Sequence, residues 1–179
     1  MFIEISLQGY VKNSMAKRAI DLFGDIEHPN EIVVILLFNA CAQLETAEAL
    51  DLTKKVAKEM LESFYANPRI SSSLLDALIK CGDISSAEIL FSKMTKSSAN
   101  YAVLMGGFNK ENNFDKTLRL FDRMKLDGVE ADLFTYLRVI KAASRLGDYS
   151  LSRSIVEEIP RSLLSYNQIQ TALIDMWVR

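Results

Sequence analysis

SANYAVLMGGFNKENNFDKTLRLFDRMKLDGVEAD, residues 98–132, consists of two amphipathic halves that flank a polar break at Glu111-Asn112-Asn113. Apolar side chains recur at helical spacing in both halves, which predicts a helix on each side of the break. Asp127-Gly128 follows the second half, and glycine commonly ends a helix because it adopts the left-handed backbone conformation easily. A single hairpin of this kind leaves its apolar stripe in water, so it needs neighbours of the same kind.

The pattern of this stretch recurs along the whole chain. Similar segments are residues 9–23 and 107–121, residues 40–44 and 142–146, and residues 74–76 and 173–175. A helix pair therefore recurs after about 30 to 37 residues, and a group of three pairs recurs after roughly 100 residues. The expected repeats are 1–30 (truncated at its start), 31–67, 68–97, 98–132, 133–166 and 167–179 (first helix only). This organisation predicts an all-α fold, a solenoid of stacked antiparallel helix pairs in a single array over residues 1–179.

The composition agrees with stacked helices and limits the possible binding sites. Hydrophobic residues make up 49% of the chain, as expected where inner helices pack on most of their surface. The longest apolar run, residues 32–38, is much shorter than the roughly 20 residues of a membrane span. Because the net charge is −2, a nucleic-acid site has to be a local stripe of cations.

The first residues of the chain and the two cysteines give information about the cellular compartment of the protein. Residues 1–5 have neither the charged start of a signal peptide nor an Arg/Ser-rich transit sequence, so we expect the chain to begin inside its first repeat. Cys41 and Cys81 occupy core-type helical positions and have no CxxC partner. We expect free thiols, which suits a reducing compartment.

Three groups of residues carry a family resemblance. They are Gly9-Tyr10 with residues 19–23, residues 75–83, and Gly128-Val129-Glu130-Ala131-Asp132. With these strings the chain resembles the pentatricopeptide repeat (PPR) family over essentially its whole length. The unequal repeat lengths and the triple period resemble the subclass with alternating long, short and standard motifs. Tetratricopeptide repeats are the nearest alternative, but the unequal lengths and the Gly-Val-x-x-Asp ending argue against them.

The resemblance implies a protein that binds single-stranded RNA along its first helices and acts in RNA processing or editing in a mitochondrion or another organelle. In the family, the fifth and last residues of a repeat hydrogen-bond one base, and second-position side chains sandwich it. The base-reading residues implied in this chain are Asn30, Asn67, Ser72, Ser97, Ala102, Asp132 and Thr171. The fifth residues Ile35 and Leu137 have no group that bonds a base edge. We therefore expect low sequence specificity.

The thirteenth position is cationic in five of six repeats, although the chain has fewer basic than acidic residues, and Gln43 is the exception. The candidate phosphate-binding residues there are Lys12, Lys80, Lys110, Arg145 and Arg179. One cation per repeat at fixed spacing suits contacts with successive phosphates. A cation in the last helical turn also favours the helix dipole by about 0.3–1 kcal/mol, and both interpretations stay open. Asp76 and Asp175, one turn away, partly cancel the positive field.

The sequence carries no recognisable catalytic or cofactor chemistry. His28 stands alone in a connector, no His/Cys cluster has metal-ligand spacing, and no glycine-rich phosphate loop follows a strand. We expect neither a metal nor a cofactor, and no enzymatic activity. The subclass that this chain resembles often ends in a cytidine-deaminase-like domain with a His-x-Glu…Cys-x-x-Cys zinc signature. This chain has no such segment, so editing needs a missing C-terminal domain or a protein partner. The alternative function is a protein-interaction scaffold with a degenerate RNA groove.

Overall fold

The computed structural model describes residues 2–60 and 67–178, and every regular element in these residues is a helix. The contacts divide the chain into two compact units, Met1–Thr95 (unit 1) and Lys96–Arg179 (unit 2). Unit 1 contains α1 (Phe2–Lys12), α2 (Ala16–Phe23), α3 (Glu31–Leu44), α4 (Ala47–Glu59), α6 (Pro68–Lys80) and α7 (Ile84–Lys93). Unit 2 contains α8 (Ser98–Lys110), α9 (Phe114–Leu126), α10 (Leu133–Leu146), α11 (Tyr149–Glu158), α12 (Arg161–Leu164) and α13 (Asn167–Val178). The predicted all-α fold is confirmed.

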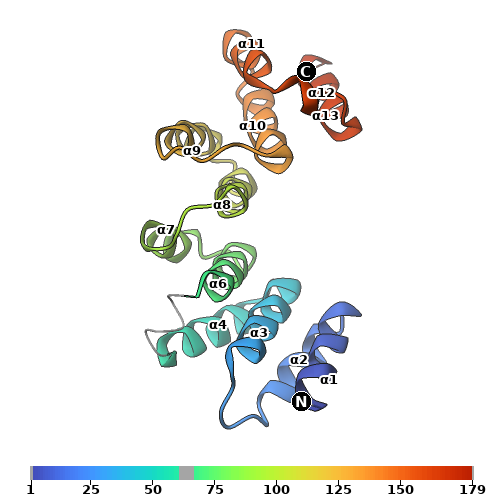
Figure 1. Ribbon diagram of the computed structural model, residues 1–179, viewed down its shortest axis with the longest axis vertical. Coiled ribbons are helices and arrows are strands. Elements are labelled where there is room, and N and C mark those ends of the chain that lie inside the picture. The colour runs from blue at the N-terminus through green and yellow to red at the C-terminus, as the bar shows by residue number, and fades with distance from the viewer. Residues whose placement is uncertain (1, 61–66, 179) are drawn as a thin grey trace. The chain divides into compact units, whose positions relative to one another are not determined.

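Successive helices form antiparallel pairs, and the first helices of the pairs pack side by side within each unit (Figure 1). In unit 1, α3 lies between α1 and α6, and in unit 2, α10 lies between α8 and α13. We call these six the first helices, and α2, α4, α7, α9 and α11 the second helices. The first helices α3, α6, α8, α10 and α13 begin at the residues where the sequence places the start of a repeat. No helix in the described ranges is both long and apolar enough to cross a membrane.

Local sequence explains where the helices begin and end. Asp83 and Asp148 are N-caps whose carboxylates accept hydrogen bonds from the backbone N–H of Ser86 and Leu151, respectively. Each follows a glycine with a positive φ, 90° at Gly82 and 70° at Gly147, a conformation that other residues adopt at a cost.

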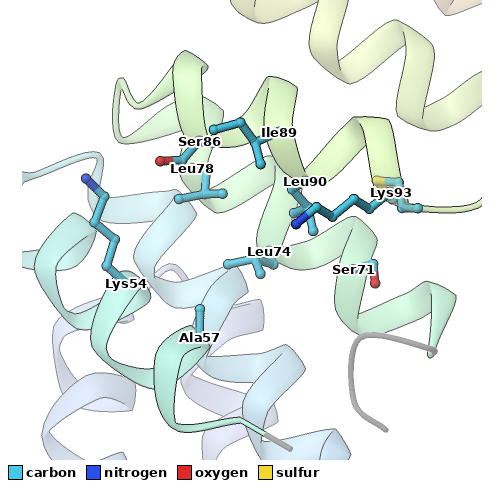
Figure 2. A pocket seen from close by; sticks show the side chains of 10 residues that line it. Lys54, Ala57, Ser71, Leu74, Leu78, Ser86, Ile89, Leu90 and Lys93 are labelled. Atoms are coloured by element: carbon cyan, nitrogen blue, oxygen red, sulfur yellow. The ribbon is translucent and has the colours of Figure 1, made fainter. Parts of the chain in front are cut away.

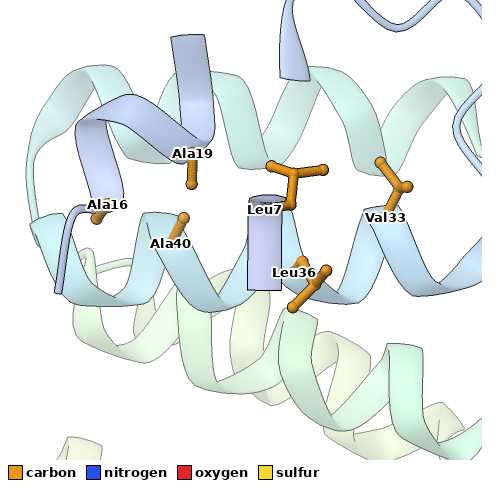
Figure 3. Packing of buried hydrophobic residues seen from close by; sticks show 6 residues of the cluster. All are labelled: Leu7, Ala16, Ala19, Val33, Leu36 and Ala40. Atoms are coloured by element: carbon orange, nitrogen blue, oxygen red, sulfur yellow. The ribbon is translucent and has the colours of Figure 1, made fainter. Parts of the chain in front are cut away.

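The core of the first repeats shows why the hairpins need neighbours. Leu7 of α1, Ala19 of α2 and Leu36 of α3 belong to one buried cluster, so three helices contribute to it. Figure 3 shows Ala19 and Ala40 at the contact of α2 with α3, where small side chains allow close approach. The first helix α3 is thus buried by helices of more than one repeat, as in solenoids generally.

Candidate nucleic-acid interface

A groove between α3 and α6 brings together side chains from the predicted RNA-facing positions of unit 1. It is lined by Ile35, Asn39, Pro68, Arg69, Ser72, Ser73 and Asp76. Ile35 and Ser72 are fifth residues of their repeats, whereas Asn39 and Asp76 are ninth residues one helical turn further on. The fold therefore places the fifth and ninth residues of adjacent repeats on one surface. We call it the α3/α6 groove.

Unit 2 has an equivalent groove between α10 and α13. Its lining includes Leu137, Lys141, Arg145 and Asp175. Leu137 corresponds to Ile35, Lys141 to Asn39 and Asp175 to Asp76 when the triple period is applied. The same arrangement has thus formed twice in the chain, once in each unit. We call this second surface the α10/α13 groove.

Several polar groups in both grooves have no hydrogen-bond or ion-pair partner among the described residues. In the α3/α6 groove, the Asn39 amide, the Ser72 hydroxyl and the Arg69 guanidinium make no hydrogen bond or ion pair with any described residue. In the α10/α13 groove the same holds for the ammonium group of Lys141 and the carboxylate of Asp175. These groups remain available to a polar ligand, whose hydrogen bonds they satisfy without breaking an internal contact.

The predicted last-position residues all begin a first helix, where they act as N-caps. Asn30 Oδ1 accepts from the backbone N–H of Val33 at 3.0 Å, and its amide donates to Glu4 Oε1 at 2.5 Å. Asn67 Oδ1 accepts from the backbone N–H of Arg69 at 2.9 Å, and its amide donates to Glu31 Oε2 at 2.7 Å. Both amides are therefore held in one orientation, with a donor and an acceptor already engaged.

Ser97 and Asp132 also cap helices. Ser97 Oγ accepts from the backbone N–H of Asn100 at 3.3 Å, and Asp132 Oδ1 accepts from that of Thr135 at 2.8 Å. Burial alone raises the pKa of Asp132, but hydrogen bonds from Ser98 and Thr135 outweigh it, so the pKa lies below its usual value. Asp132 is consequently an ionised acceptor at neutral pH.

The fifth-position candidates differ in how much surface they present. Thr171 is exposed on α13, and Ser72 is half-buried in the α3/α6 groove. Ala102 of α8 is only 6% exposed, so its methyl group offers a base almost no surface. Arg138 of α10 lies beside the ninth position of α8, where a Cβ on Gly106 would sit 3.3 Å from the Arg138 Nε. This part of α8 is covered by the neighbouring repeat.

The predicted phosphate-binding cations lie in the last turns of the first helices. Lys12, Lys110 and Arg145 are exposed at the ends of α1, α8 and α10. Lys80 instead forms an ion pair with Asp76, with Nζ and Oδ2 2.9 Å apart. The partial cancellation expected from Asp76 is therefore a direct contact. Arg179 lies outside the described residues.

Exposed second-position residues were absent from the candidates that the sequence supplied. Ile32 is 55% exposed, Phe134 is 63% exposed, and the Arg69 side chain is exposed along the α3/α6 groove. A planar or apolar side chain in the first turn of a helix, outside the buried stripe, is the signal that identifies them. Phenylalanine and arginine both stack on nucleobases.

The second-helix side of unit 1 has a different, mainly apolar hollow between α4, α6 and α7. Figure 2 shows Leu74, Leu78 and Leu90 within it and Lys54 and Lys93 near its ends. The Lys54 ammonium is held by a carboxylate of the α6–α7 turn at 2.6 Å. None of the predicted RNA-contacting residues lines this hollow. Within the described ranges, no group of three or more His, Cys, Asp or Glu residues is arranged to hold a metal ion.

Comparison with known proteins supports the expected family. The family model for the PPR repeat matches residues 70–98 and 100–129. A chloroplastic pentatricopeptide repeat-containing protein of Arabidopsis thaliana is 28% identical over 82% of this chain and 20% of its own length. A second Arabidopsis thaliana protein of the same description is 30% identical over 79% of this chain and 18% of its own length. A mitochondrial one is 21% identical over 97% of this chain and 28% of its own.

Solved structures agree with the fold. The crystal structure of the pentatricopeptide repeat protein PPR10 from maize matches 95% of this chain and 25% of that chain, with a TM-score of 0.65 at 21% identity. PPR10 in complex with an 18-nt psaJ RNA element matches 96% of this chain and 25% of that chain, with a TM-score of 0.66 at 20% identity. At such identities the likeness establishes the fold, and the chain spans about a quarter of the PPR10 chain.

The fold and its paired grooves define a helical-repeat protein of the α-solenoid class. Residues 70–98 and 100–129 match the model of the pentatricopeptide repeat, and the relatives extend this similarity over most of the chain.

Proposed function

We propose that this chain is a non-catalytic module that binds single-stranded RNA in organellar RNA processing or editing. The observation that carries the proposal is the pair of equivalent grooves between adjacent first helices, each of which includes a ninth residue, Asn39 or Lys141, whose polar group has no partner among the described residues. The PPR match and the neighbour solved with bound RNA support it. Relatives described as chloroplastic or mitochondrial support an organellar location, including a mitochondrion.

Three kinds of side chain divide the work in the proposed complex. Second-position residues such as Arg69 and Phe134 stack on the bases, because they are exposed and planar. Lys12, Lys110 and Arg145 contact phosphates, whereas Lys80 contributes less because Asp76 neutralises it. The base edges are read by Ser72 and Thr171 at fifth positions and by the N-cap residues Asn30, Asn67, Ser97 and Asp132 at last positions.

The proposal includes the PPR subclass with alternating long, short and standard motifs, and it assigns the reaction on the RNA to another domain or protein. Repeats 31–67, 68–97 and 98–132 differ in length in the manner of alternating long, short and standard motifs. Any processing or editing reaction is carried out by a further domain or a protein partner, since these residues offer binding groups and no reactive centre.

Binding of single-stranded RNA to the full chain, measured by fluorescence anisotropy at low and moderate salt, tests the proposal. We expect binding that weakens with salt and that exceeds binding to duplex RNA, whose bases are not accessible for stacking. Lack of binding at low salt would contradict an RNA module and leave the protein-interaction scaffold as the remaining function.

A further inference from the structure

The α3/α6 groove contains a polar residue from a repeat whose fifth residue cannot form a hydrogen bond with a base. In the repeat 31–67 the fifth residue is Ile35, which neither donates nor accepts a hydrogen bond. Asn39 lies one turn further along the same helix and lines the same groove. Its half-buried amide has a donor and an acceptor, neither of which is used within the described part of the chain.

The other side chains in this groove restrict which base suits it. Asp76 lies across from Asn39 on α6, and its carboxylate is acceptor-only although Lys80 balances its charge at 2.9 Å. Ser72 adds a hydroxyl that donates or accepts, and Ile35 provides an apolar wall. A base that presents an amino donor next to a ring-nitrogen acceptor complements an amide and a carboxylate. Adenine and cytosine have such an edge. Uracil has no exocyclic amino group, and its single donor, the ring N3–H, is flanked by two carbonyl oxygens that a carboxylate repels.

We propose that Asn39 is the specificity-determining residue of the α3/α6 groove and that this groove accepts adenine or cytosine in preference to uracil. The Asn39 Oδ1 accepts from the exocyclic amino group, and the Asn39 Nδ2 donates to the adjacent ring nitrogen. In this repeat the ninth residue therefore takes the place of the fifth residue in hydrogen-bonding the base. The inference rests on the proposed RNA-binding function and adds a residue and a base class to it.

Short homopolymeric RNAs of adenylate, cytidylate and uridylate test this directly, because every register then places the same base in the groove. The Asn39→Ala variant is expected to bind the adenylate and cytidylate oligomers about 3- to 10-fold more weakly, the effect of losing one or two neutral hydrogen bonds. Its affinity for the uridylate oligomer is expected to change less than about 2-fold. Asn13→Ala, which removes an exposed amide in the turn after α1, serves as the matched control with no base-dependent change.

A rescue variant separates a lost contact from a damaged fold. Ile35→Asn in the Asn39→Ala background returns an amide to the same groove and is expected to recover part of the adenylate affinity. Equal losses on all three oligomers, or no loss on any, would overturn the role of Asn39 while the RNA-binding proposal stands. If the unaltered chain binds none of the oligomers, the proposed function itself fails.

Discussion

Asp76 determines how much of the Lys80 charge is available to an RNA phosphate, because the two side chains are in direct contact. Lys12 and Arg145 have no such partner among the described residues, and Lys110 is exposed at the end of α8. Replacing Lys12, Lys110 and Arg145 by Ala should reduce the slope of log affinity against log salt by about 2, at roughly 0.7 per phosphate contact with single strands. Anisotropy titrations at several salt concentrations measure this slope.

Two comparisons make that result specific. Lys80→Ala should change the slope by clearly less than one contact, since the ion pair with Asp76 already offsets the charge. A triple Ala variant of the exposed second-helix cations Lys17, Lys55 and Arg119 removes the same charge from the other side of the pairs. If this second triple variant flattens the slope equally, the cations act through net charge and not through local contacts.

Asp127, at the end of α9, makes stability in unit 2 depend on pH. It accepts a hydrogen bond from the Tyr101 hydroxyl at 2.5 Å and one from Arg123 Nε at 3.1 Å, and these bonds lower its pKa. Because the folded pKa lies below the unfolded value, the stabilisation is present above the unfolded pKa and is lost as pH falls through the folded pKa. Asp127→Asn should therefore flatten the fall in melting temperature between about pH 5 and pH 2.

Thermal unfolding followed by circular dichroism over this range provides the measurement. Asp51→Asn, at an exposed site on α4, is the control. Identical pH profiles for the Asp127 variant and the unaltered chain would show that the Tyr101 contact contributes nothing to the acid limb.

For single residues, the sequence predicts roles that depend on the neighbouring turn of chain, but not contacts between residues that are far apart in the sequence. Asp83 and Asp148 each follow a glycine directly in the sequence, a pattern that indicates an N-cap, and both are N-caps in the structure, because a cap depends only on the next turn of chain. The bond from Asn67 to Glu31 was not predicted, because it joins the starts of two helices that meet only after folding. The Asp76–Lys80 ion pair, in contrast, lies within one helix, and the sequence already indicated it because the two residues are one turn apart.

At the scale of a helix, the last-position residues carry a structural duty besides any contact with RNA. Asp132 caps α10, because its Oδ1 accepts hydrogen bonds from both the backbone N–H and the hydroxyl of Thr135. Asp132→Ala should cost about 1 kcal/mol in the free energy of unfolding, the usual loss for an N-cap. Asp132→Asn keeps an acceptor oxygen and should cost less, which urea unfolding distinguishes. Equal losses in both variants would mean that the negative charge, and not the cap, stabilises this helix start.

The helices themselves followed from the sequence more fully than the surfaces between them. Repeat starts read from the sequence coincide with the starts of α3, α6, α8, α10 and α13, because capping residues and apolar spacing are local signals. The α3/α6 and α10/α13 grooves, in contrast, depend on how two helices pack. The presence of ninth residues in these grooves and the burial of Ala102 therefore became visible only in three dimensions.

For the molecule as a whole, the stacking of repeats predicts which helices lose stability when a core residue of one helix is substituted. Each first helix contacts its immediate neighbours, as α6 contacts α3, α4 and α7. Repeat arrays therefore distribute stability as local terms plus nearest-neighbour terms. Leu75→Ala in the core of α6 should cost about 2–5 kcal/mol and should lower the amide protection of α3, α4, α6 and α7, with little change in α10 and α13.

Hydrogen exchange measured peptide by peptide tests this gradient. Leu104→Ala, at a buried position of α8, is the matched substitution in unit 2 and should lower protection in α8, α9 and α10 instead. Uniform loss of protection along the chain in both variants would mean that all helices unfold as one cooperative block. Opposite gradients in the two variants would mean that each groove is stabilised by the repeats around it, so that a substitution in one unit leaves the groove of the other intact.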